Sequence, residues 1–514
     1  MTEVLPDARS RAAEPAPTAD PVRRRAWWIA IVAWACALAA GWLSGSLVPM
    51  ICGLLVAALA LVDTDPDFVP AHSYGLTGLP DGPPSVLAMS ARAHRAAALV
   101  GALAILGLSV LKVATAVSIA VLLVVALVTW LRSSPQIAGR RHLKKLRRAL
   151  VAHAPTVAMP FAGRSGAPWQ VGQWEPFLAA SDEPGVVLNV HRKYLPMLID
   201  GGLLSTPVVQ LGTRGTADLS TVVVPTVRAM FYVQNAATNV DFLATPDVTH
   251  VWLGHGDSDK PGSHSHTHHL YDLIVVCGQA GIDRYAAHGV EVPQRQFVVL
   301  GRPQTRGIHA ASGPIGSIQS PTVLYAPTWH GVDPAAGFSS LEQGPQLVQA
   351  LVDRGVTVIF RPHPSSYHWR HHREAVQRVR DVLRADRERT GREHQYGAGV
   401  DRELSVVDCI NRCDALVTDV SAVASDVLAS GKPYAMVTPG ASIEQFRTER
   451  PVAETAYVIL GDMTNLEDAL DDLLFHDPMA LARAQRRGYV LGDLTGSQSA
   501  QAFSQFVRAM VGSA

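Results

Sequence analysis

The chain has 514 residues, 48% of them hydrophobic, and equal numbers of acidic and basic residues give it a formal net charge of zero at pH 7. This length suffices for several domains, and the neutral balance argues against a nucleic-acid binder. The five cysteines lack the spacing of a zinc site, and a cytosolic domain would keep them reduced.

The N-terminal part predicts a disordered segment followed by a membrane region. Residues 1–22 are rich in Pro, Ala and charged residues, a composition typical of disorder. Two apolar blocks follow within residues 23–135. The block from Trp27 to Val62 has no charged residue, and the block from Ala96 to Leu131 contains only Lys112.

The length of these blocks predicts transmembrane hairpins. Each block has 36 residues, and one helix of that length would span ~54 Å, well beyond a bilayer core. We therefore expect two hairpins with two to four spans in all; a single tilted span is the alternative for the second block. Buried helices of a soluble protein and a signal peptide fit less well, because the blocks are long and no cleavage site closes the first.

Basic residues at both ends predict the orientation. Arg23, Arg24 and Arg25 precede the first block, and a basic helix is expected over residues 136–150. By the positive-inside rule both ends are cytoplasmic. The expected location is the cell membrane, multi-pass, with the catalytic part in the cytoplasm. The basic helix is expected either to attract anionic membrane lipids or to serve only as a topology signal.

After residue 150, short apolar runs alternate with longer stretches, which favours parallel sheets. We expect one Rossmann-like domain over residues 151–310 and a second over residues 311–514, joined by a linker rich in Gly, Pro and Ser. The strands expected in the first domain are Val186–Val190, Pro207–Leu211, Thr221–Val224, His250–Leu253, Asp272–Val276 and Gln296–Leu300. Those expected in the second are Thr322–Tyr325, Val356–Phe360, Ala415–Thr418, Tyr434–Val437 and Tyr457–Leu460. The predicted fold class is α/β of the GT-B type, in which two tandem Rossmann-like domains face a cleft, preceded here by α-helical transmembrane segments.

One motif in the first domain follows an expected strand. In Gly254-His255-Gly256 the glycines permit a sharp turn and close approach of substrate to Gly256. His255 is the candidate general base, with a structural role as the alternative. Lys260 is expected to bind phosphate or to pair with Asp257 or Asp259, either of which could also orient the His255 ring.

Three motifs in the second domain also follow expected strands, where open α/β folds bind their ligands. In Arg361-Pro362-His363-Pro364 the guanidinium suits bidentate phosphate contact, and His363 can donate a hydrogen bond or a proton. The alternative is an ordinary turn with a capping histidine.

The other two motifs of the second domain predict phosphate contacts. Tyr325-Ala-Pro-Thr328-Trp329 can offer amides and the Thr328 hydroxyl to a pyrophosphate. Asp419 and Ser421 precede an expected helix whose N-terminus favours anions, and Asp426 could reach ribose hydroxyls. Simple N-capping by Asp419 or Ser421 is the alternative.

A run of histidines invites a metal interpretation that we do not adopt. His264, His266, His268 and His269 alternate on a polar loop, where such residues are usually solvated, and no carboxylate or cysteine lies at a suitable spacing. We expect no metal ligands and no cofactor; a divalent metal is compatible with the sequence but not indicated.

Together the four motifs resemble the CDP-glycerol glycerophosphotransferase family, over about residues 180–490. The resemblance implies a GT-B fold, a CDP-glycerol or similar CDP-polyol donor and release of CMP. It assigns catalysis or phosphate binding to His255 and His363. The motifs themselves make Gly256, Lys260, Thr328, Arg361, Asp419, Ser421 and Asp426 the residues expected to bind substrate. The chain departs from the family pattern at Asp257-Ser258-Asp259, where the family usually has Thr-Pro-Leu, so these carboxylates are expected near the acceptor.

The predicted function is a membrane-anchored enzyme. It would transfer glycerol phosphate, or a related polyol phosphate, to a hydroxyl of a lipid-linked or polymeric acceptor in teichoic-acid-like cell-wall polymer synthesis. The expected partners are the donor, the acceptor and membrane lipids, without nucleic acid. Two alternatives remain: a GT-B glycosyltransferase that uses a nucleotide sugar for cell-surface polysaccharide synthesis, and a membrane scaffold with an inactive GT-B domain.

Overall fold

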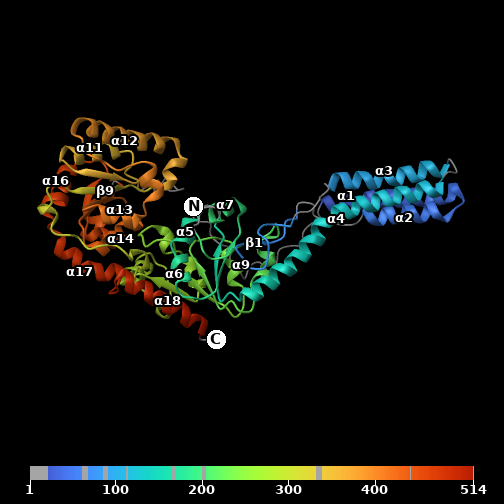
Figure 1. Ribbon diagram of the computed structural model, residues 1–514, viewed down its shortest axis with the longest axis horizontal. Helices are drawn as coiled ribbons and strands as arrows, with labels where there is room; N and C mark the ends of the chain where they lie inside the picture. Colours follow the sequence, from blue (N-terminus) through green and yellow to red (C-terminus); the bar gives the residue numbers. More distant parts are fainter. Residues whose placement is uncertain are drawn as a thin grey trace.

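The computed structural model describes residues 21–60, 68–84, 91–110, 114–163, 168–199, 204–330, 339–439 and 442–512. A helical bundle and two α/β domains follow one another along its longest axis (Figure 1). The expected disorder of residues 1–22 concerns a segment that lies, except for its last two residues, outside the described part of the chain.

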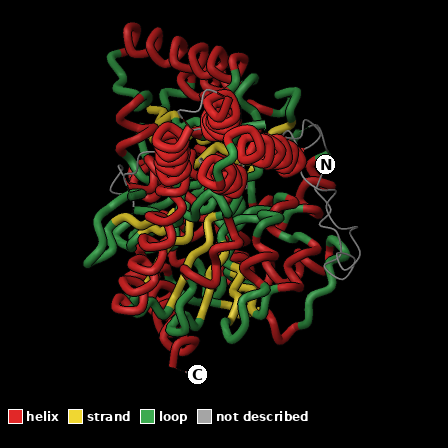
Figure 2. Tube along the Cα trace, turned by 90° about the vertical axis from the view of Figure 1, so that its right-hand side faces the viewer, coloured by secondary structure: helices red, strands yellow, loops and turns green. Residues whose placement is uncertain are grey.

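Four helices form the bundle, which Figure 2 shows end-on. They are α1 (Pro21–Ser44), α2 (Leu47–Ala60), α3 (Ala91–Val110) and α4 (Ala114–His153). Small side chains such as Ala33, Ala40 and Ala98 lie buried between them. The outer surface carries exposed large apolar side chains: Ile31, Val32, Trp34, Leu38, Trp42, Leu43, Leu47, Ile51, Leu55, Val100, Leu103, Ile119, Leu123, Val124, Leu127 and Trp130. An apolar surface of this extent is typical of a region that another apolar phase covers.

Length and composition single out one helix of the bundle. Among the described residues, only Val117–His153 is long and apolar enough to cross a membrane. Two shorter apolar helices, Leu47–Leu59 and Ala96–Gly107, pack against it, and a third, Ile29–Ser44, packs against those two. By this criterion alone the chain has one candidate span, fewer than the two to four expected.

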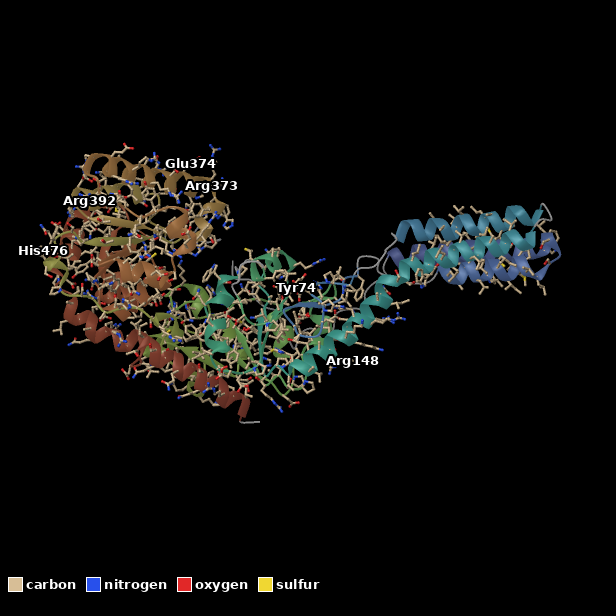
Figure 3. The ribbon with its side chains drawn as sticks, viewed as in Figure 1. Tyr74, Arg148, Arg373, Glu374, Arg392 and His476 are labelled. Atoms are coloured by element: carbon tan, nitrogen blue, oxygen red, sulfur yellow. The ribbon has the colours of Figure 1, made fainter. Side chains whose placement is uncertain are left out.

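The basic stretch at 136–150 is not a separate helix but the second half of α4. Leu146 and Leu150 are fully buried in the core of the first domain, and Arg147 Nη1 donates to the Ser220 carbonyl at 2.8 Å. Arg148 points to solvent on the opposite side of the helix (Figure 3). One rigid helix thus joins the bundle to the first domain.

Residues 68–84, the described part of the connection between α2 and α3, belong to the first domain rather than to the membrane region. Their strand β1 (His72–Tyr74) pairs antiparallel with β4 (Val208–Gln210) at the edge of the first sheet. Phe68 packs on α4, where a Cβ on Gly139 would lie 2.5 Å from the Phe68 ring. The expected membrane region of residues 23–135 is therefore interrupted by a segment that folds with the α/β part.

The first sheet has the strand order β1-β4-β3-β2-β5-β6-β7-β8, parallel except for β1. The remaining strands are β2 (Val157–Phe161), β3 (Gly185–Asn189), β5 (Ala229–Tyr232), β6 (Thr249–Trp252), β7 (Leu273–Val276) and β8 (Phe297–Val299). The helices are α5 (Trp169–Gly172), α6 (Glu175–Ala179), α7 (Leu195–Ile199), α8 (Leu219–Val222), α9 (Asn239–Leu243) and α10 (Gln279–Ala287).

One strand prediction in this domain is wrong, and three strands escaped prediction. Residues 221–224 begin inside helix α8 and do not form a strand. A short apolar run cannot be assigned to strand or helix from periodicity alone, and Pro225 ends this one in either state. The strands missed are β1, β2 and β5; the other five expected strands are confirmed.

The second sheet is parallel throughout, in the order β10-β9-β11-β12-β13. All five expected strands are confirmed: β9 (Thr322–Ala326), β10 (Thr357–Phe360), β11 (Ala415–Thr418), β12 (Tyr434–Thr438) and β13 (Tyr457–Leu460). The helices are α11 (Gly344–Asp353), α12 (Arg370–Thr390), α13 (Val406–Arg412), α14 (Ala422–Val427), α15 (Ile443–Glu449), α16 (Leu466–Asp471) and α17 (Ala480–Leu491). The chain reverses its winding between β9 and β11, and such switch points are where open α/β sheets bind ligands.

The last helix corrects the expected boundary of 311–514. Helix α18 (Gly496–Gly512) runs back to the first domain (Figure 1). Its Phe503 is fully buried there, with ring centroids 5.1 Å from Trp174 and 6.1 Å from Phe231. The apolar side of α18 covers one face of the first sheet, so the first domain is completed by the C-terminus of the chain.

Replacing Phe503 tests this docking. Phe503→Ala removes a fully buried ring and should lower the free energy of unfolding by about 3–5 kcal/mol. Thermal unfolding of the purified protein in detergent measures the effect. The exposed neighbour Gln505 on the same helix provides the control, Gln505→Ala, and equal melting temperatures for the two variants would contradict the docking.

Candidate active site

The motifs of both domains meet at the carboxyl ends of the parallel strands. Lys260 Nζ from the first domain donates to Thr328 Oγ1 of the second at 3.0 Å. Gly256 lies against the start of α14, since a Cβ on it would be 3.0 Å from the Ala422 Cβ. Gly256 thus permits close approach of the second domain, where the sequence suggested close approach of substrate.

The turn that presents His255 is fixed by two contacts of the first domain. Gly254 has φ +66°, a conformation that favours glycine, and its carbonyl accepts from Trp174 Nε1 at 2.7 Å. The His255 Nδ1 lies 3.0 Å from the Val233 carbonyl oxygen. Since a carbonyl can only accept, Nδ1 carries the proton and Nε2 has a free lone pair.

The electrostatic surroundings keep His255 neutral. Its side chain remains exposed at the cleft, yet the protein around it lowers its pKa below 6.5, mainly by desolvation and further through the charges of Lys260 and Arg302. A neutral imidazole with an unprotonated Nε2 has the form that a general base requires.

His363 has the opposite arrangement. The backbone N–H of Ser365 donates to His363 Nδ1 at 3.1 Å, so the proton of the neutral ring is on Nε2. Desolvation first, then the charges of Lys260, His255, His368 and Arg361, lower the pKa of His363 to about 3. The ring is therefore a neutral hydrogen-bond donor at physiological pH.

Two tryptophans lie beside the histidines; Trp329 belongs to a motif recognised from the sequence, whereas Trp169 does not. Trp169, at the start of α5, has its ring centroid 5.7 Å from that of His255 and 6.4 Å from that of His363. Trp329 stacks on His363 at 6.1 Å. Trp169 follows the missed strand β2, so no strand-end signal pointed to it.

Asp419 has a different position from the one expected. It is completely buried, and its carboxylate accepts from the backbone N–H groups of Thr328 at 2.7 Å and Ser340 at 3.1 Å. Burial raises its pKa to about 6, with those hydrogen bonds and Lys260 opposing the rise. Asp419 therefore positions the Thr328 turn rather than facing a ligand.

Ser421 and Asp426 are also engaged within the protein. Ser421 Oγ caps α14 by accepting from Val423 N at 3.2 Å, the capping alternative raised from the sequence. Asp426 forms a buried ion pair with Arg302, a residue of the first domain that the sequence analysis missed. This pair joins the two domains and occupies the carboxylate that was expected at the ribose.

Arg361 supports the second domain with part of its guanidinium. Its Nη1 donates to the carbonyl of Leu404 at 2.6 Å and to that of Val400. A phosphate contact would have to use its remaining N–H groups. The expected bidentate contact is not prearranged in this structure.

The residues at which the sequence differs from the family pattern, Asp257 and Asp259, form an ion triad with an arginine. Arg284 of α10 pairs with Asp257 and with Asp259, each at 2.9 Å, and all three side chains are buried. The carboxylates therefore neither orient His255, which the Val233 carbonyl does, nor face an acceptor. Ser425 Oγ donates to the Asp257 carbonyl at 2.8 Å, so the triad also lies against the second domain.

The expected solvation of the histidine run holds for only two of its members. His266 and His269 are exposed, whereas His264 stacks on His288 at 3.7 Å and His268 is fully buried. His268 interacts with the Tyr285 hydroxyl at 2.6 Å. These contacts make His264 and His268 parts of the packing of the first domain.

A separate cavity of about 610 Å³ lies between the domains beside the ion triad. Arginines and acidic side chains line it in nearly equal numbers, among them Arg284, Arg447, Glu449, Glu454 and Arg486. His255, Thr328 and His363 do not line it. The two histidines and this cavity are therefore separate features of the interface between the domains.

Comparison with protein families identifies the second domain. Residues 308–474 match the family described as CDP-Glycerol:Poly(glycerophosphate) glycerophosphotransferase. The resemblance expected from the motifs is confirmed, and the chain is an enzyme of the glycerophosphotransferase type. The match includes Thr328, Arg361, His363 and Ser421. No curated protein matches the chain.

Solved structures show more distant likenesses. Staphylococcus aureus MnaA with UDP has 14% identity and a TM-score of 0.46, over 69% of this chain and 95% of that one. The wall teichoic acid polymerase TagF has 11% identity and a TM-score of 0.43, over 72% and 94%. A glycosyltransferase from Rickettsia africae has 10% identity and a TM-score of 0.42, over 70% and 99%. Likenesses at this level identify neither ligand nor reaction.

Removing the arginine of the ion triad tests its role. Arg284→Met leaves two buried carboxylates without their cation and should lower the free energy of unfolding by about 3–5 kcal/mol. The pKa of Asp259 is already raised by burial although Arg284 lowers it. In the variant the Asp259 carboxylate should bind a proton more tightly in the folded than in the unfolded protein, so the loss of stability should shrink as the pH falls toward 3.8.

The matched control neutralises the carboxylates as well. Adding Asp257→Asn and Asp259→Asn to Arg284→Met should recover part of the stability, measured by thermal unfolding. An Arg284→Met variant as stable as the unmodified protein at neutral pH would show that the triad does not stabilise the fold.

Proposed function

We propose that this enzyme transfers glycerol phosphate, or a related polyol phosphate, from a CDP-polyol to a hydroxyl of a lipid-linked or polymeric acceptor in teichoic-acid-like cell-wall polymer synthesis. The family match over residues 308–474 supports the donor class. One observation supports the mechanism: His255 and His363 lie against the same tryptophan and present opposite hydrogen-bonding states at Nε2.

The transfer needs one group that takes a proton and others that stabilise phosphate. The acceptor hydroxyl oxygen attacks the β-phosphorus, and His255 Nε2 takes the hydroxyl proton. The bond between the β-phosphorus and the oxygen bridging to CMP breaks, and CMP leaves with that oxygen and its electron pair. Positioning and electrostatic stabilisation supply most of the rate in such phosphoryl transfers.

His363 and Lys260 are the groups we assign to the phosphates. His363 Nε2–H donates to a phosphate oxygen, and its low pKa keeps it a donor instead of a competing base. The Lys260 ammonium donates to the Thr328 hydroxyl, and this hydrogen bond places the ammonium near the carboxyl end of β9. Desolvation lowers the pKa of Lys260, which Asp419 opposes, and a bound phosphate would further favour the charged form.

The roles of the other expected residues are narrower in this proposal. Thr328 and Ser421 lie at the switch point between β9 and β11 and offer hydroxyls to the donor. Asp419 and Asp426 act as positioning residues through Thr328 and Arg302. Gly256 keeps the domains close together, and Arg361 supports the turn that holds His363.

We also propose that the helical bundle is embedded in the membrane as two hairpins, with the enzyme in the cytoplasm. The exposed apolar surface of the bundle supports embedding, although only α4 is long enough to be a span by itself. The pairing of β1 with β4 requires the loop between the hairpins to lie on the same side as the enzyme. The arginines at residues 23–25 place the N-terminal end of α1 in the cytoplasm. An even number of membrane crossings before β1 then returns the chain to the cytoplasmic side, as this pairing requires.

Substituting the two histidines tests the mechanism. Membranes carrying the protein are incubated with labelled CDP-glycerol, and CMP release and label in lipid or polymer are followed. His255→Ala and His363→Ala should each lower the rate by about 10²–10⁴-fold, because each removes a group that acts on the transferred phosphate or its attacking oxygen. His266→Ala, at an exposed histidine, is the control and should retain full activity.

The pH dependence of the same reaction separates a base from a structural histidine. Since the pKa of His255 is lowered from 6.5, kcat/KM should rise with pH and level off with a midpoint below 6.5. Release of UDP or GDP from a nucleotide sugar, with no CMP from CDP-glycerol, would overturn the proposed reaction in favour of a glycosyltransferase.

Cysteine labelling tests the topology. A membrane-impermeant thiol reagent added to intact cells should label Ser46→Cys, in the turn between α1 and α2. It should label Asp81→Cys, in the loop that follows β1, only after lysis. The unmodified chain measures the background from its five cysteines. Labelling of Asp81→Cys in intact cells would contradict the two-hairpin arrangement.

A further inference from the structure

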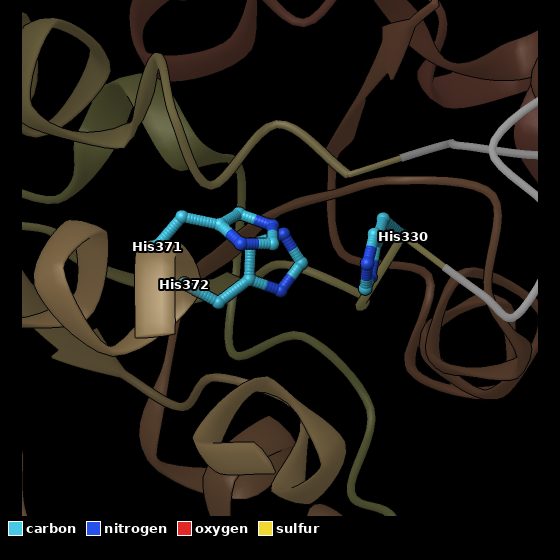
Figure 4. A group of neighbouring side chains, drawn as sticks. All are labelled: His330, His371 and His372. Atoms are coloured by element: carbon cyan, nitrogen blue, oxygen red, sulfur yellow. The ribbon is translucent and has the colours of Figure 1, made fainter. Parts of the chain in front are cut away.

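Three histidines outside the proposed transfer site converge on one point of the second domain. His330 follows β9, and His371 and His372 lie in the first turn of α12. The nitrogens that could serve as ligands all lie within 4.8 Å of one another. Figure 4 shows the rings of His371 and His372 turned toward His330.

The rings are packed face to edge at short range. Ring centroids are 4.5 Å apart for His330 and His372, 4.4 Å for His371 and His372, and 5.2 Å for His330 and His371. The Nδ1 atoms of His330 and His372 are buried and have no hydrogen-bond partner among the described residues. A buried polar atom without a partner costs ~1–3 kcal/mol, which a ligand at this point would offset.

We propose that His330, His371 and His372 bind one divalent transition-metal ion of the zinc class. Three imidazole nitrogens and one open position form a common tetrahedral zinc site. Imidazole also suits copper and nickel, whereas magnesium and calcium prefer oxygen ligands. The Zn–N distance of about 2.0–2.1 Å requires the nitrogens to move closer together, which rotation of the exposed His371 side chain allows.

The neighbouring arginine side chains do not lie in the space between the three histidines, because they have partners elsewhere. Arg370 pairs with Glu374 at 2.8 Å, and Arg373 Nη1 donates to the Tyr367 carbonyl at 2.9 Å. Figure 3 shows Arg373 and Glu374 on α12 at the outer edge of the second domain. Both arginines therefore have anionic or carbonyl partners of their own.

A metal here would join α12 to the segment that follows β9. His330 is adjacent to Trp329, which stacks on His363. The ion would therefore fix the position of Trp329 beside His363, the residue proposed to donate a hydrogen bond to phosphate. It would not contact the reacting atoms. Metal binding itself does not depend on the proposed transfer reaction.

Metal content tests the site directly. The full chain is purified in detergent through a tag without histidines, stripped with a chelator, incubated with zinc chloride and dialysed. Mass spectrometry of the metal should find one more equivalent of zinc per chain in the unmodified protein than in His330→Ala/His372→Ala. Zinc should also raise the melting temperature of the unmodified protein, because it binds only the folded state.

Two further variants keep the test independent of folding. His371→Ala changes an exposed residue, should fold normally, and should weaken zinc binding by at least about tenfold. His266→Ala/His269→Ala removes two other exposed histidines and should bind zinc as the unmodified protein does. Equal zinc affinity in the unmodified protein and His371→Ala, or no bound zinc in either, would overturn the proposal.

Discussion

Two hydrogen bonds between imidazole rings and the backbone determine the chemistry that the proposed site can perform. The Val233 carbonyl accepts from His255 Nδ1, and the Ser365 N–H donates to His363 Nδ1. Each bond determines which nitrogen is protonated, so one ring presents a lone pair at Nε2 and the other presents a proton. Because both pKa values are lowered, these states persist at neutral pH. Two chemically identical side chains thereby acquire different proposed roles.

Buried ion pairs hold the two domains together, so that His255 of the first domain and His363 of the second lie close to each other. Arg302 pairs with Asp426 across the interface, and the triad of Arg284, Asp257 and Asp259 lies against Ser425. A buried pair adds little net stability, but losing one partner is costly, so such pairs specify one arrangement. Helix α18 adds an apolar contact by returning from the second domain to complete the first.

Much of the fold was predictable from local patterns, and the second domain most of all. Its strands are apolar runs bounded by polar turns, and all five were recognised. The first domain was harder, because Thr221–Val224 has the composition of a strand but begins in a helix, and the run that forms β2 contains Pro160, a residue that is unusual inside a strand. Strand-end motifs pointed to the two histidines of the proposed site, His255 and His363. The sequence did not reveal the partners of Asp257, Asp259 and Asp426, because these partners are arginines distant in sequence. Trp169 and the cluster of His330 with His371 and His372 arise only from tertiary contacts.

The most direct measurement is an experimental structure of the full chain with CDP-glycerol bound. We expect the pyrophosphate between the two histidines, with His363 Nε2 within hydrogen-bond distance of a phosphate oxygen and His255 Nε2 open toward the β-phosphorus. The separate cavity that Arg284, Arg447 and Arg486 line together with four carboxylates also lies between the two domains. Finding the donor phosphates there, with neither histidine near them, would contradict the central claim.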